Sequence, residues 1–140
     1  MRIMLDTCVL IELITESGRL SRDVEAMLYD YDNILCVSIE SLKELVVLYN
    51  RKGFGRKIWK TSEIMIHDII DTFDIEPLPL RLEHVITYSN LVINEAEDHH
   101  DPSDHIIISH AITNKMTLVS SGRKFPFYRT QGLDLVYNEL

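Results

Sequence analysis

Cysteine is scarce in this sequence, and its scarcity narrows the chemistry open to the chain. Only Cys8 and Cys36 occur among 140 residues, both in apolar surroundings and without Cys-x-x-Cys spacing. Buried, reduced thiols are therefore favoured over a disulfide, a zinc site or redox chemistry. The chain also contains no Walker lysine loop, no Gly-x-Gly-x-x-Gly segment and no Ser-His-Asp spacing, so the usual signatures of nucleotide binding and triad catalysis are missing.

Long apolar runs are absent as well. No run approaches the roughly 20 residues that a membrane-spanning helix requires. The N-terminus places Asp6 where a signal peptide would need a continuous apolar core, so we expect a cytoplasmic protein without a membrane segment. Internal repeats, low-complexity segments and linkers are also lacking. With 46% hydrophobic and 26% charged residues, the sequence predicts a single domain over residues 1–140.

Positive charge is in short supply, because 14 Lys and Arg stand against 22 Asp and Glu and leave a net charge of −8. This balance argues against a basic surface that wraps nucleic acid. It does not exclude an enzyme acting on nucleic acid, because a divalent cation held by carboxylates reverses the local sign. One basic cluster, interleaved with Phe54 and Trp59, is a candidate phosphate contact, although a solvated helix edge also explains it. Its members are Arg51, Lys52, Arg56, Lys57 and Lys60.

Short apolar runs alternate with segments of helical spacing along the chain. Strands are expected at Arg2–Leu5, Ile34–Val37, Thr72–Leu78, Met116–Ser120 and Leu133–Tyr137. Helices are expected at Cys8–Ile14 with Thr7 as cap, at 21–30 with Ser21 as cap, from Ser38 to Gly53 and Gly55, and at Trp59–Ile70, Leu82–Glu95 and Pro102–Asn114. This alternation predicts an α/β fold whose central parallel sheet is covered on both faces. Ligands of such sheets bind at the carboxyl ends of the strands, where Asp6 and Ser120 lie.

The densest group of metal-competent side chains is the stretch His99-His100-Asp101-Pro102-Ser103-Asp104-His105, where a loop should become a helix. A local explanation suffices for this stretch by itself, with Asp101 as N-cap, Pro102 at the first helical position and Asp104 in the first turn. For the histidines, a place on the loop or helix surface is favoured over metal ligation. The His100-Asp101 pair also suggests the HD phosphohydrolases, but that class is all-helical and the predicted strands argue against it.

Two further acids favour a functional interpretation. Asp6 ends an otherwise apolar strand, and Glu44 is surrounded by apolar neighbours, although each alone would also suit a surface position. Together with Asp104 they would place three carboxylates at one end of the sheet, where their repulsion is costly unless a cation lies between them. Ligation by oxygen alone indicates Mg²⁺ or Mn²⁺, and hence phosphate chemistry.

Taken in order, these segments resemble the acidic motifs of PIN-domain ribonucleases, specifically VapC-type toxins of toxin–antitoxin pairs. The matching segments are Leu5-Asp6-Thr7, Ser38-x5-Glu44-Leu45, His100-Asp101-Pro102-Ser103-Asp104 before Ile106–Ala111, and Leu118–Phe125. The resemblance covers nearly the whole chain. It implies a PIN-like three-layer α/β/α fold with about five strands, Mg²⁺- or Mn²⁺-dependent hydrolysis of RNA to 5′-phosphate and 3′-hydroxyl ends, a homodimer, and a small antitoxin that covers the active site.

The resemblance also implies roles for individual residues. Asp6, Glu44 and Asp104 match the catalytic metal-binding carboxylates, and Asp101 is a helix cap and a further candidate ligand. Ser120 matches a hydroxyl residue that contacts a metal-bound water or a phosphate oxygen. The candidate contacts for the RNA backbone are Arg51, Lys52, Arg56 and Lys57.

The sequence departs from the family pattern at Gly122, where a fourth acid is usual. Two-metal hydrolysis uses one ion to form hydroxide and another to stabilise the leaving oxygen, so losing a carboxylate should weaken one site selectively. Two interpretations follow: an endoribonuclease with weakened activity, and a catalytically impaired PIN fold that binds RNA or antitoxin. A nucleotide phosphohydrolase is a third. Gly122 also suits a turn after a strand.

Overall fold

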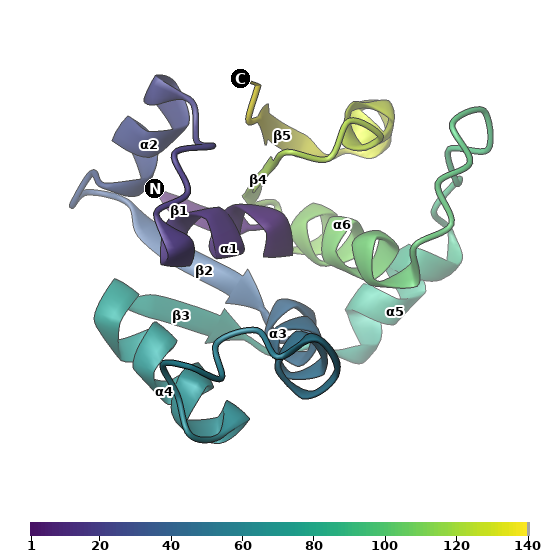
Figure 1. Cartoon of the computed structure of the whole chain (residues 1–140). Coiled ribbons are helices and arrows are strands. Elements are labelled where there is room, and N and C mark those ends of the chain that lie inside the picture. Colours follow the sequence, from purple (N-terminus) through teal and green to yellow (C-terminus); the bar gives the residue numbers. More distant parts are fainter. Residues whose placement is uncertain (140) are drawn as a thin grey trace.

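The computed structural model describes residues 1–139 and contains one parallel sheet of five strands in the order β3-β2-β1-β4-β5. The strands are β1 (Arg2–Leu5), β2 (Ile34–Ser38), β3 (Ile75–Leu78), β4 (Thr117–Ser120) and β5 (Asp134–Tyr137). The central strand β1 lies between β2 and β4 (Figure 1). Its Leu5 lies opposite Val37 of β2 and Val119 of β4. The predicted α/β class and the parallel sheet are therefore confirmed. The predicted domain runs to residue 140, which lies outside the described range.

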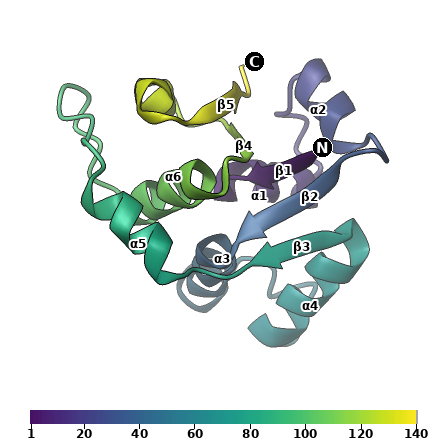
Figure 2. The same cartoon turned by 180° about the vertical axis from the view of Figure 1, so that it is seen from behind.

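Helices cover both faces of this sheet and give the predicted three layers. They are α1 (Thr7–Thr15), α2 (Arg22–Leu28), α3 (Ile39–Lys52), α4 (Ser62–Phe73), α5 (Leu82–Ser89), α6 (Pro102–Asn114) and the 3-10 helix η1 (Phe125–Gln131). Because successive side chains of a strand point to opposite faces, Ile3 and Leu5 pack in a core with α1 to α4, whereas Met4 packs in a second core with α6 and η1. Helix α5 packs against α6, which lies next to β4 (Figure 2).

Helix starts follow the side chains that cap them. Ser21 caps α2 and Ser38 caps α3, as predicted. The prediction for α1 was wrong by one residue, because the Asp6 side chain accepts the Thr7 amide and makes Asp6 the cap. Helix α4 begins at Ser62 rather than Trp59, because Thr61 caps it by accepting the amide of Ile64.

Three other boundaries differ from the sequence prediction by three or more residues. Helix α4 continues to Phe73, and Asp74 ends it in the left-handed conformation, so β3 begins only at Ile75. Helix α5 ends at Ser89 instead of Glu95, and the chain then turns around the buried Asn94. The 3-10 helix η1 was not predicted. No helix within residues 1–139 is long and apolar enough to cross a membrane.

The topology brings the acidic segments together at the carboxyl ends of the strands. Asp6 directly follows β1, and α3 starts directly after β2, while Ser120 is the last residue of β4. From β1 the chain continues to β2 on one side of it, whereas β4 lies on the other side of β1. The carboxyl ends of β1 and β4 therefore form a switch point in the strand order. Helix α6 contacts both α3 and β4, which brings its start to the same edge.

Candidate active site

Asp6 is the most buried of the predicted carboxylates, with 4% of its surface exposed. Its Oδ1 accepts the Thr7 amide at 2.8 Å, and its Oδ2 accepts the Ser120 hydroxyl at 2.7 Å and the Cys8 thiol at 3.2 Å. Burial raises the pKa of Asp6, the hydrogen bonds from Ser120 and Cys8 oppose the rise, and the charge of Asp101 adds to it. A carboxylate at this position is costly unless a positive charge lies nearby.

Glu44 reaches the same region from α3. Its Oε1 accepts the Thr7 hydroxyl at 2.5 Å, and that hydroxyl also lies 2.9 Å from Ser41 Oγ. Thr7 therefore connects the start of α1 to α3 and holds one oxygen of Glu44. Burial raises the pKa of Glu44, and the charges of Asp6 and Asp101 raise it further, while the Thr7 hydrogen bond lowers it.

Asp104 enters from the first turn of α6. The predicted capping arrangement is present, because Asp101 Oδ1 accepts the amides of Ser103 at 2.9 Å and of Asp104 at 3.4 Å. Burial and the charges of Asp6, Asp101 and Glu44 raise the pKa of Asp104 to about 8. Three carboxyl groups from three separate elements thus influence one another, with Asp101 at their margin.

Two histidines that we expected on the surface are buried beside these acids. His99 is 3% exposed; its Nε2 lies 2.9 Å from Asp104 Oδ2, and its Nδ1 lies 2.8 Å from the Tyr128 hydroxyl. His105 is 4% exposed, and its Nε2 lies 2.9 Å from the carbonyl oxygen of His99. Only His100 occupies the exposed loop position, 2.7 Å from Asp98 Oδ1. No local pattern revealed the role of His99, because its partner Tyr128 lies 29 residues away in the sequence.

Gly122, the departure from the family pattern, sits against an aromatic ring. A Cβ atom at position 122 would lie 2.6 Å from Phe125 Cδ1, and Phe125 is itself 2% exposed. The amide of Gly122 donates to Ser120 Oγ at 3.0 Å, which in turn donates to Asp6. Gly122 is therefore a close-approach glycine, and an acid there would have to displace a buried ring.

The basic cluster of residues 51–60 begins at the C-terminal end of α3, beyond the carboxylates. Arg51 and Lys52 form the last turn, and Gly53 ends the helix with a φ of 75°. Arg56 donates to the carbonyl oxygens of Tyr49 at 2.8 Å and Asn50 at 2.6 Å, so its guanidinium closes the end of the helix. The side chain of Lys57 is exposed.

Basic side chains that the sequence analysis did not select lie closer to the acids. Arg123 and Lys124 line an open pocket together with Asp101 and Asp104. The charge of Lys124 lowers the pKa of Asp104 and so offsets part of its rise. The pocket therefore carries two cationic side chains next to the carboxylates of Asp98, Asp101 and Asp104.

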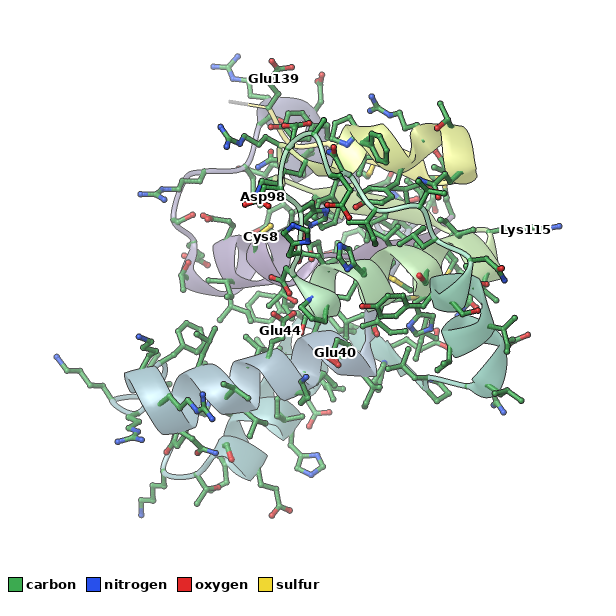
Figure 3. All side chains as sticks on the ribbon, turned by 90° about the vertical axis from the view of Figure 1, so that its right-hand side faces the viewer. Cys8, Glu40, Glu44, Asp98, Lys115 and Glu139 are labelled. Carbon is green, nitrogen blue, oxygen red and sulfur yellow. The ribbon has the colours of Figure 1, made fainter. Side chains whose placement is uncertain are left out.

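The donor set suits a hard divalent cation, although it is not a preformed cage. Within residues 1–139, no three His, Cys, Asp or Glu side chains are arranged so that they already form a metal site. Glu44 Oε1 and Asp104 Oδ2 are held by Thr7 and His99, whereas Glu44 Oε2 and Asp104 Oδ1 make no hydrogen bond in that range. Figure 3 shows Glu40 and Glu44 pointing from α3 toward the start of α6. The mutual repulsion of the Asp6, Glu44 and Asp104 carboxylates would favour a bound Mg²⁺ or Mn²⁺.

Comparisons with known proteins agree with this fold. Chains of the same fold occur in VapBC2 from Rickettsia felis bound to a promoter DNA fragment, with 22% identity, a TM-score of 0.68, and coverage of 99% of this chain and 100% of that chain. VapBC-1 from nontypeable Haemophilus influenzae follows with 18% identity, a TM-score of 0.66 and 98% of both chains covered. VapBC-5 from Mycobacterium tuberculosis, a member of the VapBC family of toxin–antitoxin systems, has 18% identity and a TM-score of 0.58 over 99% of this chain and 98% of that chain. No curated protein sequence matches the chain. The family model described as PIN domain matches residues 3–133, and the chain therefore belongs to the PIN domain family.

Proposed function

We propose that this chain is a Mg²⁺- or Mn²⁺-dependent endoribonuclease that acts as the toxin of a toxin–antitoxin pair. The observation that carries this proposal is the gathering of Asp6, Glu44 and Asp104, where burial and the charges of Asp6, Asp101 and Glu44 raise the pKa of Asp104 to about 8. Such a cluster opposes folding when its members are charged, and a bound cation would relieve this repulsion and supply the Lewis acid that a nuclease uses. The shared fold with chains of VapBC structures supports the toxin assignment.

Each residue near the site has a role in this proposal. Asp6, Glu44 and Asp104 hold the cation, and Asp101 is a further candidate ligand. When bound, the cation would make a coordinated water more acidic and neutralise charge on the phosphodiester, whose hydrolysis leaves 5′-phosphate and 3′-hydroxyl ends. Ser120 orients Asp6, because its hydroxyl is engaged by Asp6 and by the Gly122 amide.

RNA would approach over the basic side chains that flank the acids. Lys124 and Arg123 are the nearer contacts, because they line the pocket that Asp101 and Asp104 share. Arg51, Lys52 and Lys57 extend along the end of α3 and are candidate contacts for a more distant part of the backbone. Arg56 serves the same surface indirectly, since its hydrogen bonds to two carbonyl oxygens fix the end of α3.

Cleavage of mixed RNA by the purified chain tests the proposal. We expect cleavage in Mn²⁺ or Mg²⁺, loss of cleavage in EDTA, and at least a hundredfold loss with Asp6→Asn. Asp71→Asn is the matched control, because Asp71 is an exposed acid on α4 away from the site. Expression of the wild type should also arrest growth, and Asp6→Asn should relieve the arrest. Equal cleavage by the wild type and Asp6→Asn would refute the proposed site.

The packing of Phe125 against Gly122 favours a second candidate, a PIN fold that binds RNA or antitoxin without cutting. This packing occupies the space of a fourth acid, so Gly122→Asp alone is a poor test. The double variant Gly122→Asp/Phe125→Leu restores a carboxylate and makes room for it. An inactive wild type and an active double variant would favour this second candidate over the endoribonuclease, whereas preference for mononucleotides over RNA would indicate a nucleotide phosphohydrolase.

Three further expectations belong to this proposal. An antitoxin partner is supported by the VapBC structures that share the fold. A homodimer is supported by the apolar side chains of Leu82, Val85 and Ile86, which are 76%, 53% and 53% exposed on α5; light scattering should give twice the mass of one chain. A cytoplasmic location is supported by the free thiols of Cys8 and Cys36.

A further inference from the structure

A buried hydrogen-bonded chain runs from the loop before α6 to the Asp104 carboxylate. The amide of Asn94 donates to the Tyr128 hydroxyl at 3.1 Å, and that hydroxyl lies 2.8 Å from His99 Nδ1. The opposite ring nitrogen, His99 Nε2, lies 2.9 Å from Asp104 Oδ2. We propose that His99 is a positioning residue that fixes the Asp104 carboxylate for a divalent cation, an inference that rests on the proposed function.

The hydrogen-bond partners determine the tautomer of His99 when Asp104 is a carboxylate. A carboxylate only accepts, so His99 Nε2 must carry the proton and donate it to Asp104 Oδ2. The neutral ring then has an unprotonated Nδ1, which accepts the Tyr128 hydroxyl proton. The Tyr128 oxygen is left to accept the Asn94 amide, as observed. Each donor in this series of hydrogen bonds has one acceptor, so the His99 ring has a single orientation.

The ring of His99 is also held by packing. The Phe125 ring lies 5.7 Å from it between centroids, and the His105 ring lies 4.7 Å from it in an edge-on arrangement. The backbone is fixed as well, because the His99 amide donates to the Asn94 carbonyl and the His99 carbonyl accepts His105 Nε2. His99 is thus fixed by the loop, by α6 and by η1 at the same time.

This packing also explains why position 122 has no side chain. Phe125 approaches position 122 so closely that only glycine leaves room for its ring, and the same ring packs on His99. The chain therefore has an aromatic wall behind His99 where the family pattern has a fourth acid. The packing of Phe125 therefore both supports His99 beside Asp104 and leaves no room for a side chain at position 122.

The hydrogen bond of His99 selects which oxygen of Asp104 is available. Oδ2 is engaged by His99, and Oδ1 makes no hydrogen bond within residues 1–139. A carboxylate held at one oxygen presents the other in a fixed direction, so less conformational freedom is lost when a cation binds. Partners of metal ligands that act in this way typically contribute about 10- to 100-fold in metal affinity.

Mn²⁺ binding to the full chain, measured by the electron paramagnetic resonance signal of free Mn²⁺, tests this role without relying on cleavage. We expect His99→Leu to weaken Mn²⁺ binding about 10- to 100-fold. His99→Gln should recover much of the affinity, because its amide nitrogen is a donor that reaches as far as Nε2. Tyr88→Phe is the matched control, since within residues 1–139 the Tyr88 hydroxyl makes only a 3.5 Å contact with His105 Nδ1 and none with Asp104.

Tyr128→Phe gives a second, independent test, because it removes the proton that fixes the His99 tautomer while leaving His99 in place. It should weaken Mn²⁺ binding less than His99→Leu does, and circular dichroism should show that each variant is folded. Wild-type affinity in a folded His99→Leu variant, or equal losses in the Leu and Gln variants, would overturn the inference. A wild type that binds Mn²⁺ but leaves RNA intact would instead refute the proposed function and leave the role of His99 standing.

Discussion

His110 should make the fold sensitive to acid, and this effect is separable from the active site. The side chain lies in α6, is fully buried, and has no hydrogen-bond partner for either ring nitrogen within residues 1–139. The only aromatic ring stacked on it in that range is His84, with 4.1 Å between the ring centroids. Burial, together with the charge of a protonated His84, lowers the pKa of His110 from 6.5 to about 4. The neutral ring is therefore strongly favoured in the folded state.

The direction of the pH effect follows from this lowered pKa. Well above pH 6.5 His110 is neutral in both the folded and the unfolded chain and contributes nothing to the pH dependence. As the pH falls from 6.5 toward 4, the unfolded chain takes up a proton at His110 and the folded chain does not, so the free energy of unfolding falls. A difference of about 2.5 pH units corresponds to about 3 kcal/mol in total, of which about 2 kcal/mol is lost between pH 7 and pH 5.

Urea unfolding at pH 7 and pH 5, followed by circular dichroism, measures this loss. The variant His110→Leu removes the titrating ring at similar volume, so its free energy of unfolding should fall about 2 kcal/mol less than that of the wild type over this range. Titrating groups that are not coupled to His110 contribute equally to both proteins and cancel in the comparison. His67→Gln is the control, because His67 is exposed on α4 and should leave the pH dependence unchanged. Equal losses in the wild type and His110→Leu would refute the reasoning.

Three further predictions concern the candidate site. The pKa of Asp104 is raised from 3.8 to about 8, so its charge destabilises the metal-free fold as the pH rises through this range. Asp104→Asn should therefore raise the melting temperature in EDTA at pH 8, and it should abolish RNA cleavage. Gly122→Ala should lower the free energy of unfolding by about 1–3 kcal/mol through its clash with Phe125, and the added change Phe125→Leu should restore part of that loss in urea unfolding. Lys124→Ala should raise the KM for RNA several-fold with little change in kcat, and more than Lys52→Ala does; equal effects in steady-state kinetics would place the substrate along α3 instead.

Local interactions made much of the fold predictable from the sequence. The order of strands and helices follows from short apolar runs and from apolar residues at helical spacing. Both patterns involve only residues that are close together in the sequence. The start of α6 is an example, because Asp101, Pro102 and Asp104 form a capping arrangement within four residues, and the helix occupies the predicted span of Pro102–Asn114. The three candidate carboxylates were also proposed from the sequence. Asp6 and Glu44 were chosen because an acid at a strand end or among apolar residues is unusual, and Asp104 because it lies in the stretch rich in metal-competent side chains.

Only the tertiary structure decided how those carboxylates are held. The role of His99 depends on Tyr128, 29 residues away, and the chemistry of Gly122 depends on a ring that folds back over it. The buried state of His110 depends in the same way on α5 packing against α6. Burial, tautomer and pKa arise from groups that meet only after folding, so no local pattern encodes them. The sequence alone determined which acids approach the edge of the sheet, and packing determined which oxygen each acid leaves free.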